Sequence, residues 1–259
     1  MRDLTVIIPI EVLDTDEKKI LLMSAIDSVD DSNILVVGSK KAIESISSYE
    51  KLSEYTFATV INTSKNTTYA SQVMFALKSV KSKYFTVLEY DDVFSNIWFK
   101  NLNAYIEQDV NDTFAFFPLT ELVDFNTKAS IGYANEAVWA SSFSEEIGCY
   151  DLQSFEDYFN FNASGAVFKT DEFVSMGGLK VSLKLVTWYE FILRVLYKGK
   201  RLFVIPKVGY YHYVNRNDSM TSLYASTMTE KEAEWWIDLA KKEYLFPHDR
   251  KKTYTEDEE

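Results

Sequence analysis

The alternation of short apolar runs with amphipathic stretches restricts the fold of this sequence more than any other feature. The apolar runs are four to seven residues long, as expected of strands buried on both faces, and the stretches between them repeat apolar residues at helical spacing. The runs cover residues 4–10, 34–37, 57–61 and 84–88, and the helical stretches cover 18–29, 69–80 and 98–106. Strands that alternate with helices predict an α/β fold built on a mostly parallel, doubly wound sheet.

The second half of the chain has a less regular pattern. Residues 113–125 predict a long strand or a strand pair, and residues 126–162 are expected to form an irregular insertion over the active face. Strand-like runs over 163–168 and 201–206, a short helix from Thr170 and a helix over 189–197 follow. The last helix should begin after Thr229, because Thr229 and Glu232 form a capping box.

Neither a linker nor an internal repeat divides the chain, so we expect one domain over residues 1–246 and a polar tail over 247–259. The nucleotide-binding half would cover 1–112 and the acceptor half 113–246. The net charge of −12 disfavours nucleic acid and anionic membranes as overall partners. Cys149 has no second cysteine to pair with, and no apolar run is long enough to span a bilayer, so we expect a cytoplasmic protein.

Three carboxylates follow the apolar run over 84–88 within four residues, namely Glu89, Asp91 and Asp92. Ligands of open parallel sheets bind at the carboxyl ends of the strands. Clustered carboxylates in a partly dry cleft repel one another, and Mg²⁺ or Mn²⁺ prefers a few carboxylates together with phosphate oxygens. The motif therefore indicates a metal that holds a diphosphate, although a solvated acidic turn before the next helix would have the same sequence.

Several segments, taken in order, resemble family 2 GT-A glycosyltransferases. The resemblance extends over about residues 4–222, and the order of the motifs makes it more specific than any single one. The segments are TVIIP at 5–9, ILVVGS at 34–39, EYDD at 89–92, GAVF at 165–168, MGGL at 176–179, FILRV at 191–195, KGK at 198–200, VIP at 204–206 and YHY at 211–213.

The resemblance implies a GT-A fold and metal-dependent transfer of a sugar, with inversion, from a nucleotide sugar, most readily a UDP-sugar. Mn²⁺ or Mg²⁺ would be the cofactor. The metal ligands implied are Asp91, Asp92 and His212, and Asp92 would also hold the sugar; His212 could equally be a buried, hydrogen-bonded histidine. The residues expected along the nucleotide are Pro9, Ile10, Glu11, Gly38, Ser39, Glu89, Tyr90 and Asp91.

The sequence departs from the family's pattern at the general base. Thr187 and Trp188 stand where the family has a Glu-Asp pair, and Gly38 replaces an acid that reads the nucleotide base. We expect Glu190 to act as the base from a shifted helix start, with Asp157 in reserve, and Trp188 to be a stacking platform for a sugar. Glu190 could instead be an exposed helix acid. Rival bases are Glu145, Glu146, Asp151 and Glu156.

Two other functions stay open. A degenerate relative would bind a nucleotide or sugar without turnover, which the missing Glu-Asp pair and Gly38 would explain. A glycosyltransferase that acts on modified DNA bases is the second, and the acidic net charge counts against it. We expect a saccharide acceptor, and the pair Trp235-Trp236 could form a contact between two copies of the chain.

Overall fold

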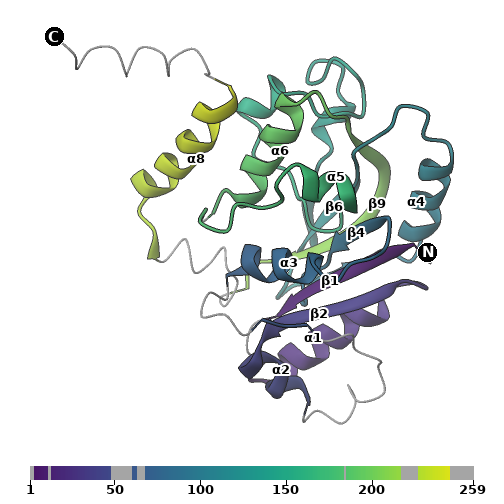
Figure 1. Cartoon of the computed structure of the whole chain (residues 1–259), viewed down its shortest axis with the longest axis vertical. Helices are drawn as coiled ribbons and strands as arrows, with labels where there is room; N and C mark the ends of the chain where they lie inside the picture. The colour runs from purple at the N-terminus through teal and green to yellow at the C-terminus, as the bar shows by residue number, and fades with distance from the viewer. Residues whose placement is uncertain are drawn as a thin grey trace.

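The computed structural model describes residues 3–10, 13–47, 60–62, 68–183, 185–216 and 227–245. Within these residues, nine strands form one mixed sheet in the order β3-β2-β1-β4-β8-β6-β9-β5, with β7 paired to β6 (Figure 1). The strands are β1 (Leu4–Ile10), β2 (Asn33–Ser39), β3 (Val60–Asn62), β4 (Tyr84–Val87), β5 (Val93–Phe94), β6 (Ala115–Asp124), β7 (Ser130–Ala134), β8 (Val167–Lys169) and β9 (Leu202–Val214). The helices are α1 (Asp16–Asp27), α2 (Lys40–Ser47), α3 (Tyr69–Leu77), α4 (Trp98–Glu107), α5 (Thr170–Ser175), α6 (Thr187–Tyr197) and α8 (Glu230–Tyr244).

The first half of the sheet has the parallel arrangement that the sequence predicts. β1 pairs in parallel with β2 and β4, and β2 pairs in parallel with β3. Successive residues of β1 point to opposite faces, so Ile7 joins the core beneath α3 and α6, whereas Val6 and Ile8 join the core beneath α1, α2 and α4. Figure 1 shows α1 and α2 on one side of β1 and β2, and α3 on the other.

The second half of the sheet mixes directions. β8 lies antiparallel to both β4 and β6, and β9 runs parallel to β6. β9 is much longer than the predicted run over 201–206, because it continues to Val214 beside β6 and β5. The predicted irregular insertion contains β7 and two 3-10 turns, η2 (Ala137–Trp139) and η3 (Ser154–Glu156). Because four of the five residues of β7 are at least partly exposed, its sequence lacks the apolar pattern of a buried strand.

The C-terminal helix α8 begins where its capping box predicts. The hydroxyl of Thr229 accepts a hydrogen bond from the backbone N–H of Glu232 at 3.2 Å. The helix packs against α6, and Figure 1 shows the two side by side. None of the helices in the described ranges combines the length and apolar character that crossing a membrane requires. The predicted tail over 247–259 lies outside the described residues.

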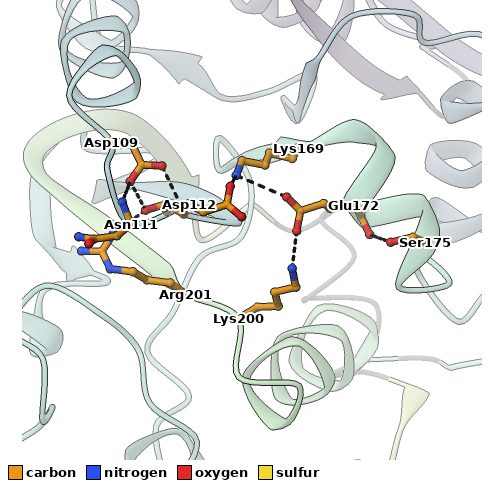
Figure 2. Close-up of polar contacts among 9 residues, drawn as sticks. Asp109, Asn111, Asp112, Lys169, Glu172, Ser175, Lys200 and Arg201 are labelled. Carbon is orange, nitrogen blue, oxygen red and sulfur yellow. Dashed lines mark hydrogen bonds and ion pairs between the residues drawn. The ribbon is translucent and has the colours of Figure 1, made fainter.

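A network of ion pairs lies at the edge of the sheet where β4, β6 and β9 begin (Figure 2). Lys169 at the end of β8 pairs with Asp112 and, at 3.4 Å, with Glu172 of α5. The second carboxylate oxygen of Glu172 accepts from Lys200 at 2.7 Å. Arg201 lies beside this chain of contacts and donates to the hydroxyl of Thr113 at 2.5 Å. Each acid of this network therefore has a cationic partner. We call these residues the basal network.

Candidate functional site

The acidic segment after β4 lies at the opposite edge of the sheet from the basal network. Because β1, β2 and β4 run parallel, all three strands end at this edge. The backbone N–H of Asp92 closes a turn onto the carbonyl of Glu89 at 3.1 Å. The chain then enters β5, whose antiparallel pairing with β9 places Val93 opposite Tyr211. This pairing brings the end of β9 to the acidic segment, and we call the resulting site the acidic edge.

Asp92 is fully buried and both of its carboxylate oxygens have partners on β9. Its Oδ2 lies 2.7 Å from Nδ1 of His212, and its Oδ1 accepts from the backbone N–H of Tyr213 at 2.8 Å. Because the pKa of His212 is raised to about 9, its imidazole is protonated at neutral pH and Nδ1 donates to Oδ2 of Asp92. Asp92 therefore anchors the imidazole through Nδ1 and is not part of a solvated turn, so Nε2 is the nitrogen that Asp92 does not engage.

Asp91 is paired with an arginine. The guanidinium of Arg216 donates from one nitrogen to Oδ2 of Asp91 at 2.6 Å and from another to the hydroxyl of Tyr90 at 2.8 Å. Arg216 is only 5% exposed. Burial and the neighbouring Asp92 raise the pKa of Asp91 to about 6, although Arg216 acts in the opposite direction. The structure thus supplies a positive charge to Asp91, but not enough to cancel the effect of burial.

Glu89 is the first acid of the acidic edge, and it contacts residues of α3, of β9 and of the loop before β8. The hydroxyl of Ser164 donates to Oε1 at 2.9 Å, and the backbone N–H of Glu89 donates to the hydroxyl of Tyr210 at 3.1 Å. The side chain of Tyr69 on α3 is also within hydrogen-bonding reach. Burial, followed by the charges of Asp91 and Asp92, raises the pKa of Glu89 to about 7. The carboxylate therefore lies where ionisation is costly.

The contact of Tyr210 with Glu89 depends on a glycine. Gly165 has φ of +80°, and a Cβ at this position would lie 2.4 Å from the ring of Tyr210. The backbone N–H of Gly165 donates to the carbonyl of Val87 at 2.8 Å, which holds it against the end of β4. A residue with a side chain would meet both a strained backbone and a clash. Glycine here lets the chain pass close to the ring beneath Glu89.

His212 sits among carboxylates, which determine its charge. Burial alone would lower its pKa, but Asp92, then Asp91 and Glu89, outweigh burial and raise the pKa to about 9. The imidazole is consequently a cation at neutral pH in this arrangement. A hydrogen on Nε2 can be donated to an anion, whereas loss of that proton would free Nε2 to bind a metal.

The residues predicted along the nucleotide at the ends of β1 and β2 are closely packed. Ile10 is 1% exposed, and its carbonyl accepts from the buried amide of Gln72 at 3.1 Å. A Cβ on Gly38 would lie 2.8 Å from the side chain of Ile10, so this position leaves no room for a larger residue. Ser39 accepts from the backbone N–H of Ala42 at 3.1 Å, in the first turn of α2. Pro9 is buried, and Glu11 lies outside the described residues.

Glu190 lies beneath α8 and not at the acidic edge. Its side chain is 2% exposed, so it is not the exposed helix acid that the sequence allows as an alternative. Oε2 pairs with Arg194 at 2.9 Å, and Oε1 contacts Lys180 at 2.9 Å and the hydroxyl of Tyr244 at 2.5 Å. Arg194 also donates to the carbonyls of Met176 and Gly178. These contacts join α6, α8 and the turn after α5, and α6 already begins at Thr187.

The other candidate bases lie in the insertion. The side chain of Asp157 is 90% exposed and pairs with Lys241 of α8 at 3.3 Å. Asp151 accepts from the backbone N–H of Ser154 at 2.7 Å, at the start of η3, and Glu146 pairs with Arg201 at 2.9 Å. Asp157 therefore has the carboxylate that is most open to solvent of these three.

Trp188 is connected to the acidic edge through a tyrosine. Its indole nitrogen donates to the hydroxyl of Tyr69 at 3.1 Å, and Tyr69 in turn lies beside Glu89. One face of the indole stacks on Phe168, with the ring centroids 5.4 Å apart and an angle of 12° between the planes. Any sugar that contacts Trp188 must therefore use its other face or its edge.

Three residues of the site have no local sequence signal. Arg216 follows β9 by two positions, Tyr69 begins α3 and Ser164 precedes β8, and only the tertiary fold brings each of them to the acidic edge. The aromatic and apolar pattern of their segments predicts secondary structure but no contact with Glu89 or Asp91. A search of the segment after the last strand for a cation to balance the acids would have found Arg216.

The donor set at the acidic edge fits a hard divalent ion with two protein ligands. Asp91 offers a carboxylate and His212 offers Nε2, and Asp92 holds the imidazole from behind, as a carboxylate commonly does for a metal-binding histidine. In the described residues, no group of three or more His, Cys, Asp or Glu side chains is arranged around one ion. Ions that keep several waters and bind substrate phosphates need few protein ligands, so two suffice.

A comparison with known protein families matches more than half of the chain. Residues 28–165 match the sequence model described as Glycosyl transferase family 2. This match begins at the end of α1, includes the acidic edge up to Asp92 and ends at Gly165, beside Tyr210. No curated protein matches the chain.

Solved structures share the fold at low sequence identity. The chain is 14% identical to residues 1–349 of TarS from S. aureus in complex with UDP-GlcNAc, with a TM-score of 0.62 over 86% of this chain and 61% of that one. It is 15% identical to the mannosyltransferase PcManGT from Pyrobaculum calidifontis in complex with GDP-Man and Mn²⁺, with a TM-score of 0.56 over 97% and 64%. This chain thus spans less than two thirds of either protein. The predicted GT-A type of α/β fold is confirmed.

Proposed function

This chain belongs to glycosyl transferase family 2, and from that membership we propose that it transfers a sugar from a nucleotide-sugar donor to an acceptor hydroxyl, with help from a divalent metal. The observation that carries the proposal is the acidic edge, where Glu89, Asp91 and Asp92 are gathered at the carboxyl ends of the parallel strands. A site of this kind suits a ligand that brings positive charge together with phosphate. The solved complex of TarS contains UDP-GlcNAc, and that of PcManGT contains GDP-Man and Mn²⁺.

In this proposal Asp91 and Nε2 of His212 hold Mn²⁺ or Mg²⁺. When bound, the ion supplies positive charge against the leaving diphosphate. Asp92 keeps Nδ1 of His212 engaged and so aims the imidazole. Its own oxygens are already bonded to His212 and Tyr213, and we therefore assign Asp92 an indirect part in holding the metal and the sugar.

The nucleotide would lie across the ends of β1 and β2, along Pro9, Ile10, Glu11, Gly38 and Ser39. Glu89 and Tyr90 would contact the ribose and the first phosphate, since both precede Asp91 in the same turn. The bound UDP-GlcNAc of TarS favours a UDP-sugar over other donors. The small Gly38 leaves the base without a carboxylate partner at that position, so backbone groups would have to recognise it.

Of the two predicted general bases, the contacts favour Asp157 over Glu190. A base must have an oxygen available to the acceptor hydroxyl, and both oxygens of Glu190 are bonded within the protein. Asp157 is exposed and pairs with Lys241. One displacement assisted by one base inverts the anomeric carbon, which is the outcome we propose. Trp188 would contact the sugar or acceptor through the face or edge that does not stack on Phe168.

A binding protein without turnover is the competing function. The observation that favours it is the engagement of Glu190 in structural contacts, since the chain then lacks a carboxylate where the family's pair stands. Nucleotide affinity is expected from either function, so binding alone does not separate them.

Hydrolysis of nucleotide sugars separates the two functions, because water can replace a missing acceptor. The purified protein with Mn²⁺ should slowly release UDP from at least one UDP-sugar, and chelation of the metal should stop the release. GDP-, CDP- and dTDP-sugars serve as the donor panel, and the anomer of the released sugar, read by NMR before it equilibrates, reports inversion. Inertness toward every donor, despite measurable UDP binding, would establish the binding function instead.

A further inference from the structure

Arg216 is built into the acidic edge. It donates there to Oδ2 of Asp91 at 2.6 Å and to the hydroxyl of Tyr90 at 2.8 Å. Its guanidinium carbon also lies 5.4 Å from the ring centroids of both Tyr90 and Phe125. With an exposed fraction of 5%, the side chain is held by both charge and packing. It therefore places a permanent positive charge beside a carboxylate proposed to bind metal.

A guanidinium and a divalent ion compete for the same carboxylate. Arginine stays protonated at all useful pH, so it cannot reduce its repulsion for an incoming cation by losing a proton. An ion that approaches Asp91 must therefore displace Arg216 from Oδ2 or bind close to another positive charge. Both routes weaken metal binding to the protein alone.

A diphosphate changes this balance. Arginine forms strong, often bidentate hydrogen bonds with phosphate oxygens, and these replace the bonds it gives up at Asp91. The released carboxylate is then available to the ion, which also binds the phosphate oxygens. The ligand that attracts Arg216 is thus the one that frees the metal site.

On the basis of the proposed function, we propose that Arg216 is an internal counter-cation that occupies Asp91 until a nucleotide diphosphate takes the guanidinium. Metal binding then depends on nucleotide binding, and by linkage each ligand raises the affinity of the other by the same factor. Arg216 becomes a diphosphate-positioning residue once the donor is bound. The protein would hold little free Mn²⁺ between reaction cycles.

Titration of Mn²⁺, followed by the electron paramagnetic resonance of the free ion, tests this inference with and without UDP. The wild-type protein should bind Mn²⁺ weakly alone and at least about fivefold more tightly with UDP. In Arg216→Gln the affinity for Mn²⁺ alone should rise by at least about fivefold, and the gain from UDP should shrink by the same factor. Arg201→Gln removes the same charge from the basal network and should behave like wild type.

The conservative variant Arg216→Lys separates charge from geometry. It should bind Mn²⁺ alone as weakly as wild type, but gain less from UDP, because lysine lacks the two-pronged donor. Arg216→Lys also tests the inference if Arg216→Gln does not fold. Equal Mn²⁺ affinity in the wild type and Arg216→Gln, with an equal gain from UDP, overturns the inference and leaves the proposed function intact. Failure of all of these proteins to bind Mn²⁺ with UDP overturns the proposed metal role and the inference together.

Discussion

The two edges of the central sheet gather acidic side chains in different ways. In the basal network, Lys169 lies between Asp112 and Glu172, and Glu172 lies between Lys169 and Lys200 (Figure 2). The hydrogen bond from Lys169 lowers the pKa of Asp112. At the acidic edge, burial raises the pKa of Glu89 to about 7 and that of Asp91 to about 6. The basal network thus stabilises the anionic form of Asp112, whereas the acidic edge disfavours the anionic forms of Glu89 and Asp91.

The difference lies in how charge is balanced. The basal network alternates acids and bases along the surface, an arrangement that contributes little to stability but also costs little. At the acidic edge the buried Asp92 and the partly buried Asp91 are paired with His212 and Arg216, and the partly buried Glu89 lies beside them. Such an excess of negative charge in a largely desolvated site lowers stability, and perturbed carboxylates in a cleft are typical of functional sites. The acidic edge is therefore suited to accept a cation.

Matched substitutions at the two edges should give the largest contrast. Asp91→Asn should lower the rate of Mn²⁺-dependent hydrolysis of a nucleotide sugar by about 10²–10³-fold, since it removes a charge that would hold the metal against the leaving group. Asp112→Asn, the same change in the basal network, should leave the rate unchanged. Release of nucleoside diphosphate measures both rates. Similar rates in the two variants would mean that the acidic edge is not the site of chemistry.

Glu190 tests whether burial or charge balance separates a structural acid from a functional one. It is as buried as Asp92 but is balanced by Arg194 and Lys180. Glu190→Gln should lower the free energy of unfolding by about 2–3 kcal/mol, because it leaves the charge of Arg194 without its partner. The hydrolysis rate per folded molecule should change by less than tenfold.

Urea denaturation and the hydrolysis rate, measured on the same preparation, check the prediction for Glu190→Gln.

Asp157→Asn is the counterpart of Glu190→Gln, because it changes the other candidate base. It should leave stability nearly unchanged, because the side chain is exposed, and should lower transfer to an acceptor by at least about 10²-fold. Slow transfer in Glu190→Gln, with normal stability, would restore Glu190 as the base.

Asp92 should show a smaller effect, because it acts through His212. Asp92→Asn should weaken the binding of Mn²⁺ in the presence of UDP by about 10–100-fold, the usual result of losing the carboxylate behind a metal-binding histidine. Asp124→Asn is a matched control, since Asp124 accepts from Asn215 and Thr127 near the surface and should not affect Mn²⁺. Calorimetry measures both. Unchanged affinity in Asp92→Asn would remove His212 from the metal site.

The smallest effect is expected within the basal network. Lys200→Met breaks the ion pair with Glu172. The side chain of Lys200 is 38% exposed and that of Glu172 is 27% exposed. The free energy of unfolding should fall by less than about 1 kcal/mol, as for other surface pairs, and the rate should not change. Urea denaturation at low and high salt checks both the size of this effect and its screening. A large loss of activity would show that the basal network also supports the site.

Local patterns predicted most of the fold. The apolar runs at 4–10 and 34–37 became β1 and β2, and the capping box placed the start of α8. Such patterns suffice where a strand is buried on both faces or a helix has one apolar stripe. They failed for β7, which is largely exposed, and for the second half of β9, where Tyr211 and His212 are only partly buried.

The place of the acidic segment at the end of a strand followed from sequence, but its contacts did not. Glu89, Asp91 and Asp92 were expected at a strand end, because they directly follow the apolar run over 84–88 that predicts a strand. The partners of Asp91 and Asp92, Arg216 and His212, lie 125 and 120 residues further along the chain. Their contacts exist because β9 runs past β5, and a strand pairing of that separation leaves no periodic trace in the sequence.

Side-chain chemistry thus fixed which residues could bind a cation, and strand pairing decided which of them meet. The sequence offered Glu190 as a base because it is the nearest acid to the place where the family has one. Packing of α8 onto α6 gave that carboxylate the partners Lys180, Arg194 and Tyr244 instead. The role of a carboxylate depends on the charges and dipoles within a few ångströms of it, and those distances are set by the tertiary fold.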